Sequence, residues 1–251
     1  GNHASPFVTE NTEYSVAATR FSVPTPQADV PIASYKENFR GLLTFIKVDS
    51  TTGRMKIAFQ ILMPGFNYDL SHSGKGPSRE WSFFTSYNSE EASTLLEVNA
   101  SQRDKDFIAA VHWTAAEQCV QDGKAKQVPA RYAHNVMDPK SHVATSTIET
   151  STTFLDAKDC PGVVYYLPTP KAPHGVDVDP SGELIAAGGK LASVIPVHSF
   201  TKMLKAIEDK AFDGDVNGIP ILKYDAVLAG EVKEPGLGPL HTEFDGKGNA
   251  Y

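Results

Sequence analysis

The chain has 251 residues, of which 41% are hydrophobic, 21% charged and 10% aromatic. These proportions are ordinary for a globular protein and exclude a largely disordered chain. Acidic residues exceed basic residues by 30 to 23, which gives a net charge of −7. Nucleic-acid binding depends mainly on cationic contacts to phosphates, so a net-acidic chain without a basic run argues against that partner. The apolar runs are far shorter than the roughly 18 residues of a membrane span, and none is expected.

Three predicted hairpins share one turn chemistry. The first joins an apolar segment, 42–48, to an alternating segment, 55–61, through a turn at 49–53. The second turns at 179–182 and the third at 245–248, and all three turns begin with Asp and end with Gly. Asp accepts backbone hydrogen bonds at the start of such turns, and Gly provides the positive φ at their end.

Helical signals are brief. Residues 114–120 predict a short helix with Thr114 as its N-cap and Gly123 after its end, and residues 199–207 predict a second helix capped by Ser199. Short strands, 19 Gly and 17 Pro around such brief helices predict an all-β fold, either a propeller or a sandwich. The repeated Asp-to-Gly hairpins favour the propeller, because each propeller blade is a small antiparallel meander.

The cysteines give little guidance from the sequence. Cys119 and Cys160 are too few for a disulfide scaffold and lack the C-x-x-C spacing of zinc sites. Two unpaired thiols are the favoured interpretation, and a single disulfide is the alternative. The segment 127–159 carries few large apolar residues and is expected to be an insertion or excursion from the strand pattern.

The ends of the chain predict a part of a longer protein. The chain does not begin with Met, and Tyr251 falls on the second strand of the third hairpin with no strand after it. A propeller closes its ring so that no blade keeps an open edge. We therefore expect residues 1–251 to form part of a β-propeller domain.

Two of the eight histidines occupy matching positions. His174 precedes the second hairpin and His241 precedes the third, each after a segment rich in Pro or Gly, 168–173 and 235–239. A rigid lead-in that places one imidazole at the same point of successive blades aims both at one axis. Neutral imidazole nitrogen suits copper or zinc, and the alternative role is turn capping or packing beneath Pro. Two histidines are too few for a complete metal site.

The other histidines carry no motif. His112 lies beside Trp113 in an apolar strand and is expected to be a satisfied core or loop residue, and His198 fits a structural polar position. Polar loops are expected to hold His72, His134 and His142.

Three strings of the chain resemble nitrous-oxide reductase. They are KAPHG at 171–175, AGGKL at 187–191 and the long, specific GLGPLHTEFDGKGNAY at 236–251. The resemblance extends back through 86–90 and covers most of the chain, and 127–159 is the least matched segment.

This resemblance implies a fold and an activity. The fold is part of a seven-bladed β-propeller with four-stranded antiparallel blades and a few short helices in loops. The activity is the two-electron reduction of nitrous oxide to dinitrogen and water, the last step of denitrification, at a tetranuclear copper–sulfide cluster. His174 and His241 match two of the seven cluster histidines and are the expected catalytic and copper-binding residues. The isolated chain, with two of seven ligands, is expected to be inactive.

The resemblance also implies partners and a location. The family is a periplasmic homodimer that takes electrons from a donor such as a c-type cytochrome or a cupredoxin. Its two-copper electron-entry site belongs to a C-terminal cupredoxin domain, expected after residue 251. Earlier blades are expected before residue 1, and the remaining blades of the propeller after residue 251.

A calcium site is implied in the same way. Glu90 and Asp104 match side-chain ligands of the family, and Tyr87 and Val98 match backbone-carbonyl ligands. Such mixed oxygen donors suit calcium, although a solvated acidic loop is the alternative interpretation of this segment. Ala172 departs from the family, which often has a calcium-binding Asn at this position.

Two other functions are kept beside the reductase. The first is a non-catalytic propeller, a scaffold that binds a partner or only calcium. The second is a zinc hydrolase, which needs a third ligand and a catalytic carboxylate near His174 and His241. The sequence shows no motif for either of these two groups.

Overall fold

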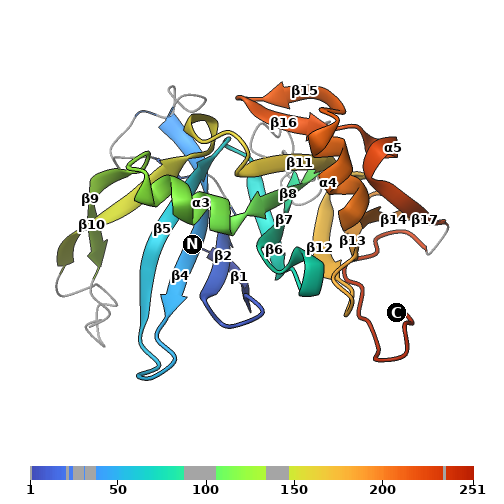
Figure 1. The fold of residues 1–251 in the computed structure, drawn as a ribbon, viewed down its shortest axis with the longest axis horizontal. Coiled ribbons are helices and arrows are strands. Elements are labelled where there is room, and N and C mark those ends of the chain that lie inside the picture. Colours follow the sequence, from blue (N-terminus) through green and yellow to red (C-terminus); the bar gives the residue numbers. More distant parts are fainter. Residues whose placement is uncertain are drawn as a thin grey trace.

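The computed structural model describes residues 2–20, 23–24, 31, 38–87, 106–133, 147–233 and 236–251. In these ranges strands dominate and form three sheets that stand side by side (Figure 1). Each sheet contains a meander of four antiparallel strands. The all-β, propeller-like fold expected from the sequence is thereby confirmed, and a ring of seven blades stays a prediction.

The first sheet has the order β1-β2-β4-β5-β10-β9, and its first four strands are the meander. The predicted first hairpin is the β4–β5 pair, with Asp49 accepting hydrogen bonds from the amides of Thr51 (2.9 Å) and Thr52 (3.1 Å). Gly53 closes the turn at φ +69°. The strands are β1 (Asn2–Val8), β2 (Tyr14–Thr19), β3 (Val23–Pro24, paired with β4), β4 (Phe39–Val48), β5 (Met55–Met63), β9 (Lys126–Ala133) and β10 (Thr147–Asp156).

The second sheet has the order β15-β16-β11-β8-β7-β6. Its meander is β6 to β11, and the hairpin β15–β16 is added through a parallel pair between β11 and β16. The first sheet is extended in the same manner, since β10 runs parallel to β5. The strands are β6 (Asn67–Ser73), β7 (Trp81–Tyr87), β8 (Phe107–His112), β11 (Val164–Pro168), β15 (Phe212–Val216) and β16 (Ile219–Leu222), with the 3₁₀ turns η2 (Gly76–Ser78) and η3 (Ala157–Asp159) nearby.

The third sheet is a four-stranded antiparallel blade, β12-β13-β14-β17. Its β12–β13 hairpin is the second predicted hairpin, with Asp179 accepting from the amides of Glu183 and Leu184. The third predicted hairpin is present as a single bridge between Phe244 and Ala250. The strands are β12 (Pro173–Val178), β13 (Leu184–Gly189), β14 (Val194–Ser199) and β17 (Leu228–Lys233).

Two helices test the predicted caps, and the structure also has a short helix, α5 (Tyr224–Val227). The helix α4 (Phe200–Glu208) begins as predicted, with the Ser199 hydroxyl accepting from the amide of Lys202 at 3.0 Å. The helix α3 (Trp113–Gln121) has His112 as its N-cap, so the prediction of Thr114 was wrong. The indole N–H of Trp113 donates to the Arg79 carbonyl at 2.9 Å, and this tertiary contact is satisfied with Trp113 as the first helical residue.

Two cores separate the three sheets. One lies between the first and second sheets and contains Phe45, Phe59 and Phe84 together with Trp113 of α3. The other lies between the second and third sheets and contains Phe83 with residues of β12, β13 and α4. Neighbouring residues of β7 thus serve opposite cores, as the alternation of side chains along a strand requires. The second sheet is therefore buried on both faces, like a blade between two other blades.

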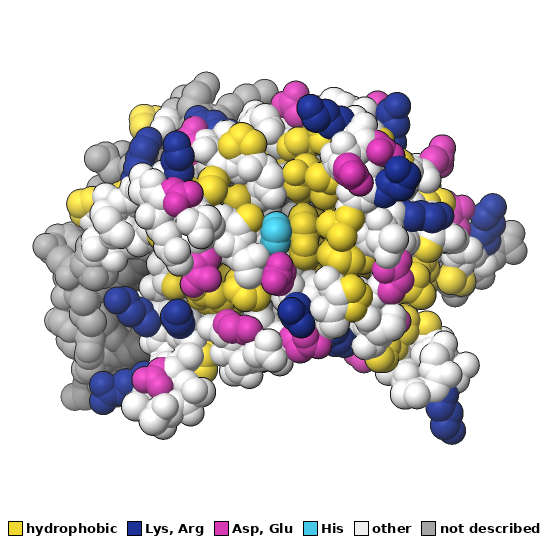
Figure 2. All heavy atoms as spheres, viewed as in Figure 1, with side chains coloured by type: hydrophobic (Ala, Val, Ile, Leu, Met, Phe, Trp, Pro, Cys, Tyr) yellow, Lys and Arg dark blue, Asp and Glu magenta, His cyan; other side chains and the backbone are white. Residues whose placement is uncertain are grey.

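The surface is mixed. On the face seen in Figure 2, acidic and basic side chains are interspersed, and hydrophobic side chains gather near its centre around a histidine. Among the described residues, no helix has both the length and the apolar character needed to cross a membrane.

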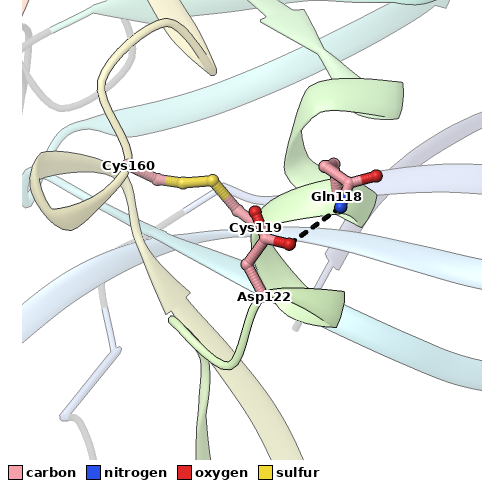
Figure 3. Close-up of a disulfide and its surroundings, with 4 residues drawn as sticks. All are labelled: Gln118, Cys119, Asp122 and Cys160. Carbon is pink, nitrogen blue, oxygen red and sulfur yellow. Dashed lines mark hydrogen bonds between the residues drawn. A yellow bond between two sulfur atoms is a disulfide. The ribbon is translucent and has the colours of Figure 1, made fainter.

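The cysteines form a disulfide, so the expectation of two free thiols was wrong and the alternative holds. Cys119 of α3 is bonded to Cys160, which follows η3, with their Cα atoms 6.6 Å apart (Figure 3). The two residues are 41 positions apart in the sequence, and their Cα atoms come close together because α3 packs against the loop before β11. The bridge joins the covering helix to the second sheet.

Candidate functional site

The first strands of the three meanders, β1, β6 and β12, lie next to one another. Strand β6 contacts β1 on one side and β12 on the other. All seven residues of β6 are buried, although most of them are polar. A buried polar strand is unusual for a core and typical of a functional centre, because each buried polar group needs a partner. The polar residues are Asn67, Asp69, Ser71, His72 and Ser73.

The three strings that carried the sequence resemblance meet beside β12. The amide of Lys190 donates to the carbonyl of Ala172 at 2.9 Å, which joins the second string to the first. The amide of Gly175 donates to the carbonyl of Leu240 at 2.7 Å, which joins the first string to the third. Residues as far apart in the sequence as Gly175 and Leu240 therefore form one local structure.

This structure brings the two predicted histidines together. The ring centroids of His174 and His241 are 5.0 Å apart, and the rings meet edge to face at 84°. His174 is held through its carbonyl, which accepts a 2.6 Å hydrogen bond from the hydroxyl of Thr85 on β7. The His241 side chain keeps 44% of its surface exposed, so a ligand can reach the pair.

Gly175 makes this approach possible. A Cβ at this position would lie 2.4 Å from the Leu240 carbonyl oxygen and 2.6 Å from Nδ1 of His241. Gly188 leaves space for Pro239 in the same way, since a Cβ on Gly188 would lie 2.5 Å from the Pro239 carbonyl oxygen. Both distances are far below ordinary van der Waals contact, so a side chain at either place would push the third string, and His241 with it, away from β12.

Asp177 is a site residue that sequence reasoning missed. Its Oδ2 accepts a 2.9 Å hydrogen bond from the amide of Thr242 and lies 3.9 Å from Nδ1 of His241. Burial raises the pKa of Asp177 above its ordinary value, while the Thr242 bond and the nearby His241 oppose that shift. An acidic residue inside the otherwise apolar strand Val176–Val178 was the available signal.

Ala172, the position that departs from the family, has an unusual backbone. It is fully buried with φ at +54°, a conformation that Asn adopts more readily than Ala. Its amide donates to Oδ2 of Asp106 at 2.7 Å. Lys190, whose backbone amide donates to the Ala172 carbonyl, forms an ion pair with the buried Asp69, with Nζ and Oδ2 3.8 Å apart. Burial lowers the pKa of Lys190, and Asp69 opposes that effect.

The predicted calcium ligands are not tested by the structure. Tyr87 ends strand β7, but its side chain lies outside the described residues. Glu90, Val98 and Asp104 also lie outside the described ranges. The calcium site thus stays a prediction.

The remaining described histidines make other contacts. His72 was expected in a polar loop, and this expectation was wrong, because His72 lies in β6. Its ring packs against that of Phe7, with centroids 4.3 Å apart and the planes tilted by 31°. Burial lowers its pKa to about 4. His112 stacks on Trp81 at 4.5 Å, and the fully buried His198 meets Tyr224 edge to face at 5.9 Å. His134 and His142 lie outside the described residues.

The pair is a partial metal site at most. In the part of the chain that the structure describes, no group of three or more His, Cys, Asp or Glu residues is arranged to hold a metal ion. A complete site around His174 and His241 therefore needs further ligands.

Fold and site together define a propeller-type β protein with two imidazoles held beside the first strand of a blade. The chain is 29% identical to nitrous-oxide reductase of Stutzerimonas stutzeri over 243 residues, which is 96% of this chain and 32% of that protein. It is 31% identical to nitrous-oxide reductase of Cupriavidus necator, covering 92% of this chain and 30% of the relative. These similarities confirm the resemblance inferred from the motifs, and the chain spans about a third of the length of these relatives.

Two other comparisons add little. No family model matches the chain. A hydrazine synthase chain of Kuenenia stuttgartiensis aligns over 93% of this chain and 75% of its own length, with 11% identity and a TM-score of 0.29. A similarity this low supports no argument about function.

Proposed function

We propose that this chain supplies three blades of the propeller of a nitrous-oxide reductase, and that His174 and His241 bind copper there. The observation that carries the proposal is the meeting of three separate motifs at one pair of imidazoles, 5.0 Å apart. In such an enzyme a four-copper sulfide cluster would supply the electrons that reduce nitrous oxide to dinitrogen and water.

The residues present fit such a metal. Imidazole nitrogen is a good copper ligand, and it must be neutral to bind. Gly175 leaves the space in which His241 lies, since a Cβ would come within 2.6 Å of Nδ1. The Asp177 carboxylate lies 3.9 Å from the same nitrogen, close enough for an electrostatic interaction with the ring but too far for a hydrogen bond. Thr85 fixes the backbone of His174.

The disulfide supports a periplasmic location. Disulfides such as Cys119–Cys160 persist in oxidising compartments and are rare in reducing ones. We propose in addition the homodimer, the c-type cytochrome or cupredoxin donor and the calcium ion expected from the resemblance. For calcium, Ala172 cannot provide a side-chain oxygen, so the proposed site depends on Tyr87, Glu90, Val98 and Asp104.

The test uses the protein expressed from its complete reading frame in a denitrifying host that lacks its own reductase. His174→Ala and His241→Ala should each lower both the copper content per protomer, measured by mass spectrometry, and the consumption of nitrous oxide. His112→Ala is the matched control, because this imidazole is also partly exposed but stacks on Trp81. Full copper loading with normal turnover in either site variant would overturn the assignment.

The same experiment separates the reductase from a non-catalytic propeller. A scaffold that binds only a partner or calcium would contain no stoichiometric copper in the wild-type protein. Zinc in place of copper, with hydrolytic activity, would instead favour the hydrolase considered from the sequence.

A further inference from the structure

A groove opens where the first sheet divides. Strand β10 pairs with β5 only through Phe154–Asp156, opposite Gln60–Leu62. Before this point the two strands separate and leave a cavity of about 450 Å³ between them. This volume lies within the range of roughly 300–1,000 Å³ that is usual for ligand sites.

The closed end of the groove is fixed by a buried hydrogen-bond chain. The side-chain amide of Gln60 donates to the Thr44 hydroxyl at 2.9 Å and accepts from the Thr152 hydroxyl at 3.1 Å. Further along, Arg40 makes two 3.1 Å hydrogen bonds to the Asp156 carboxylate. The strands are thus held together at one end and apart at the other, so the groove is a built feature of this fold.

Both walls of the groove are strand edges. Among the described residues, β5 pairs over Met55–Phe59 with β4 alone, and β10 pairs over Thr147–Thr153 with β9 alone. The facing edges of β5 and β10 therefore present backbone groups without a described strand partner. Such edges are templates for an added strand.

The groove is also basic. Lys47 and Lys56 lie directly opposite each other on β4 and β5 and both line the cavity. Like charges at directly opposite positions destabilise a sheet. Within the described part of the chain, neither ammonium group has a carboxylate partner, and the Nζ of Lys47 lies over the Tyr14 ring, 5.9 Å from its centroid. On a chain with a net charge of −7, this local pair of cations favours an anionic ligand.

The opposite wall offers hydrogen-bonding groups. Ser151, Thr152 and Thr153 of β10 line it together with Gln127 of β9, whose amide donates to the Thr153 hydroxyl at 2.6 Å. We propose that this groove binds an extended acidic peptide segment of a partner protein, by strand addition, with its carboxylates on Lys47 and Lys56. The proposal is independent of the copper site, and most of β9 and all of β10 belong to the segment 127–159 that matches the reductase family least.

The probe is a fluorescent five-residue peptide of alternating glutamate and valine, with both ends blocked, and its binding to the purified protein is followed by anisotropy at low salt. The double variant Lys47→Glu/Lys56→Glu should weaken binding about tenfold or more. Lys247→Glu, which makes half of that charge change in the distant third hairpin, should reduce affinity much less than either single groove variant, Lys47→Glu or Lys56→Glu. Because both groove lysines are exposed, the double variant should keep the wild-type circular dichroism spectrum.

Two further probes test the strand pairing itself. A peptide methylated at alternate backbone amides loses the hydrogen bonds of an added strand and should bind much more weakly. The same peptide with lysine in place of glutamate should not bind. Equal binding of the methylated peptide, or full displacement by equimolar inorganic phosphate, would show a simple anion site and overturn the peptide proposal. Unchanged binding by the double variant would overturn it as well.

Discussion

Removal of the Cys119–Cys160 disulfide should destabilise the fold strongly. The bond closes a loop of 41 residues, and the loss of chain entropy in the unfolded state for such a loop corresponds to about 4 kcal/mol. For a chain of this length, that loss should lower the melting temperature by roughly 10 °C. The effect is large because the bridge ties α3, which covers the first core, to the loop that leads into β11.

The assay compares wild-type protein with Cys119→Ala/Cys160→Ala by thermal unfolding, with and without dithiothreitol. The reductant should lower the melting temperature of the wild type to that of the double variant and leave the variant unchanged. Alkylation of the native, unreduced protein should modify no cysteine. The reasoning would be refuted by two alkylated thiols in that sample, or by a wild-type melting temperature that does not respond to reduction.

Three further predictions concern local features. Gly175→Ala should lower the free energy of unfolding by about 1–3 kcal/mol, because the added methyl group would overpack the site. Gly230→Ala should change this free energy little, since its methyl group would have no neighbouring atom within 4 Å, and equal effects of the two variants would contradict the packing argument. Ser199→Ala should cost about 1 kcal/mol by removing an N-cap, whereas Thr114→Ala, inside α3, should cost nothing, and chemical denaturation compares them. Burial lowers the pKa of His72 to about 4, so between pH 6.5 and pH 4 its imidazole is protonated in the unfolded chain but not in the folded one, and the free energy of unfolding should fall by up to about 3 kcal/mol over this range. His72→Gln should flatten this dependence in unfolding measured as a function of pH, and an unchanged slope would exclude His72 as its source.

Much of the fold was predictable because its signals are local. An Asp that accepts backbone hydrogen bonds and a Gly with positive φ fix a turn within five residues, so all three hairpins were found at Asp49, Asp179 and Asp245. The Ser199 cap was found for the same reason. His174 and His241 were selected because each occupies the same place before a hairpin, and the structure brings them together.

Other features depended on contacts between distant segments. Thr114 has the chemistry of an N-cap, but burial of Trp113 places the start of α3 one residue earlier. Two cysteines carry no pairing information until α3 packs against the loop at Cys160. Asp177 is identified as a site residue only by its tertiary contact, since its carboxylate accepts a hydrogen bond from the Thr242 amide in the third string.

The sequence by itself therefore determined the all-β class and the turns, and it selected two histidines that the structure places side by side, because these features depend on short-range hydrogen bonding and on motifs. The tertiary structure alone decided the disulfide, the space that Gly175 leaves for His241 and the divergence of β5 from β10. Each of these is a distance between residues that are far apart in the chain, and packing of whole sheets sets such distances.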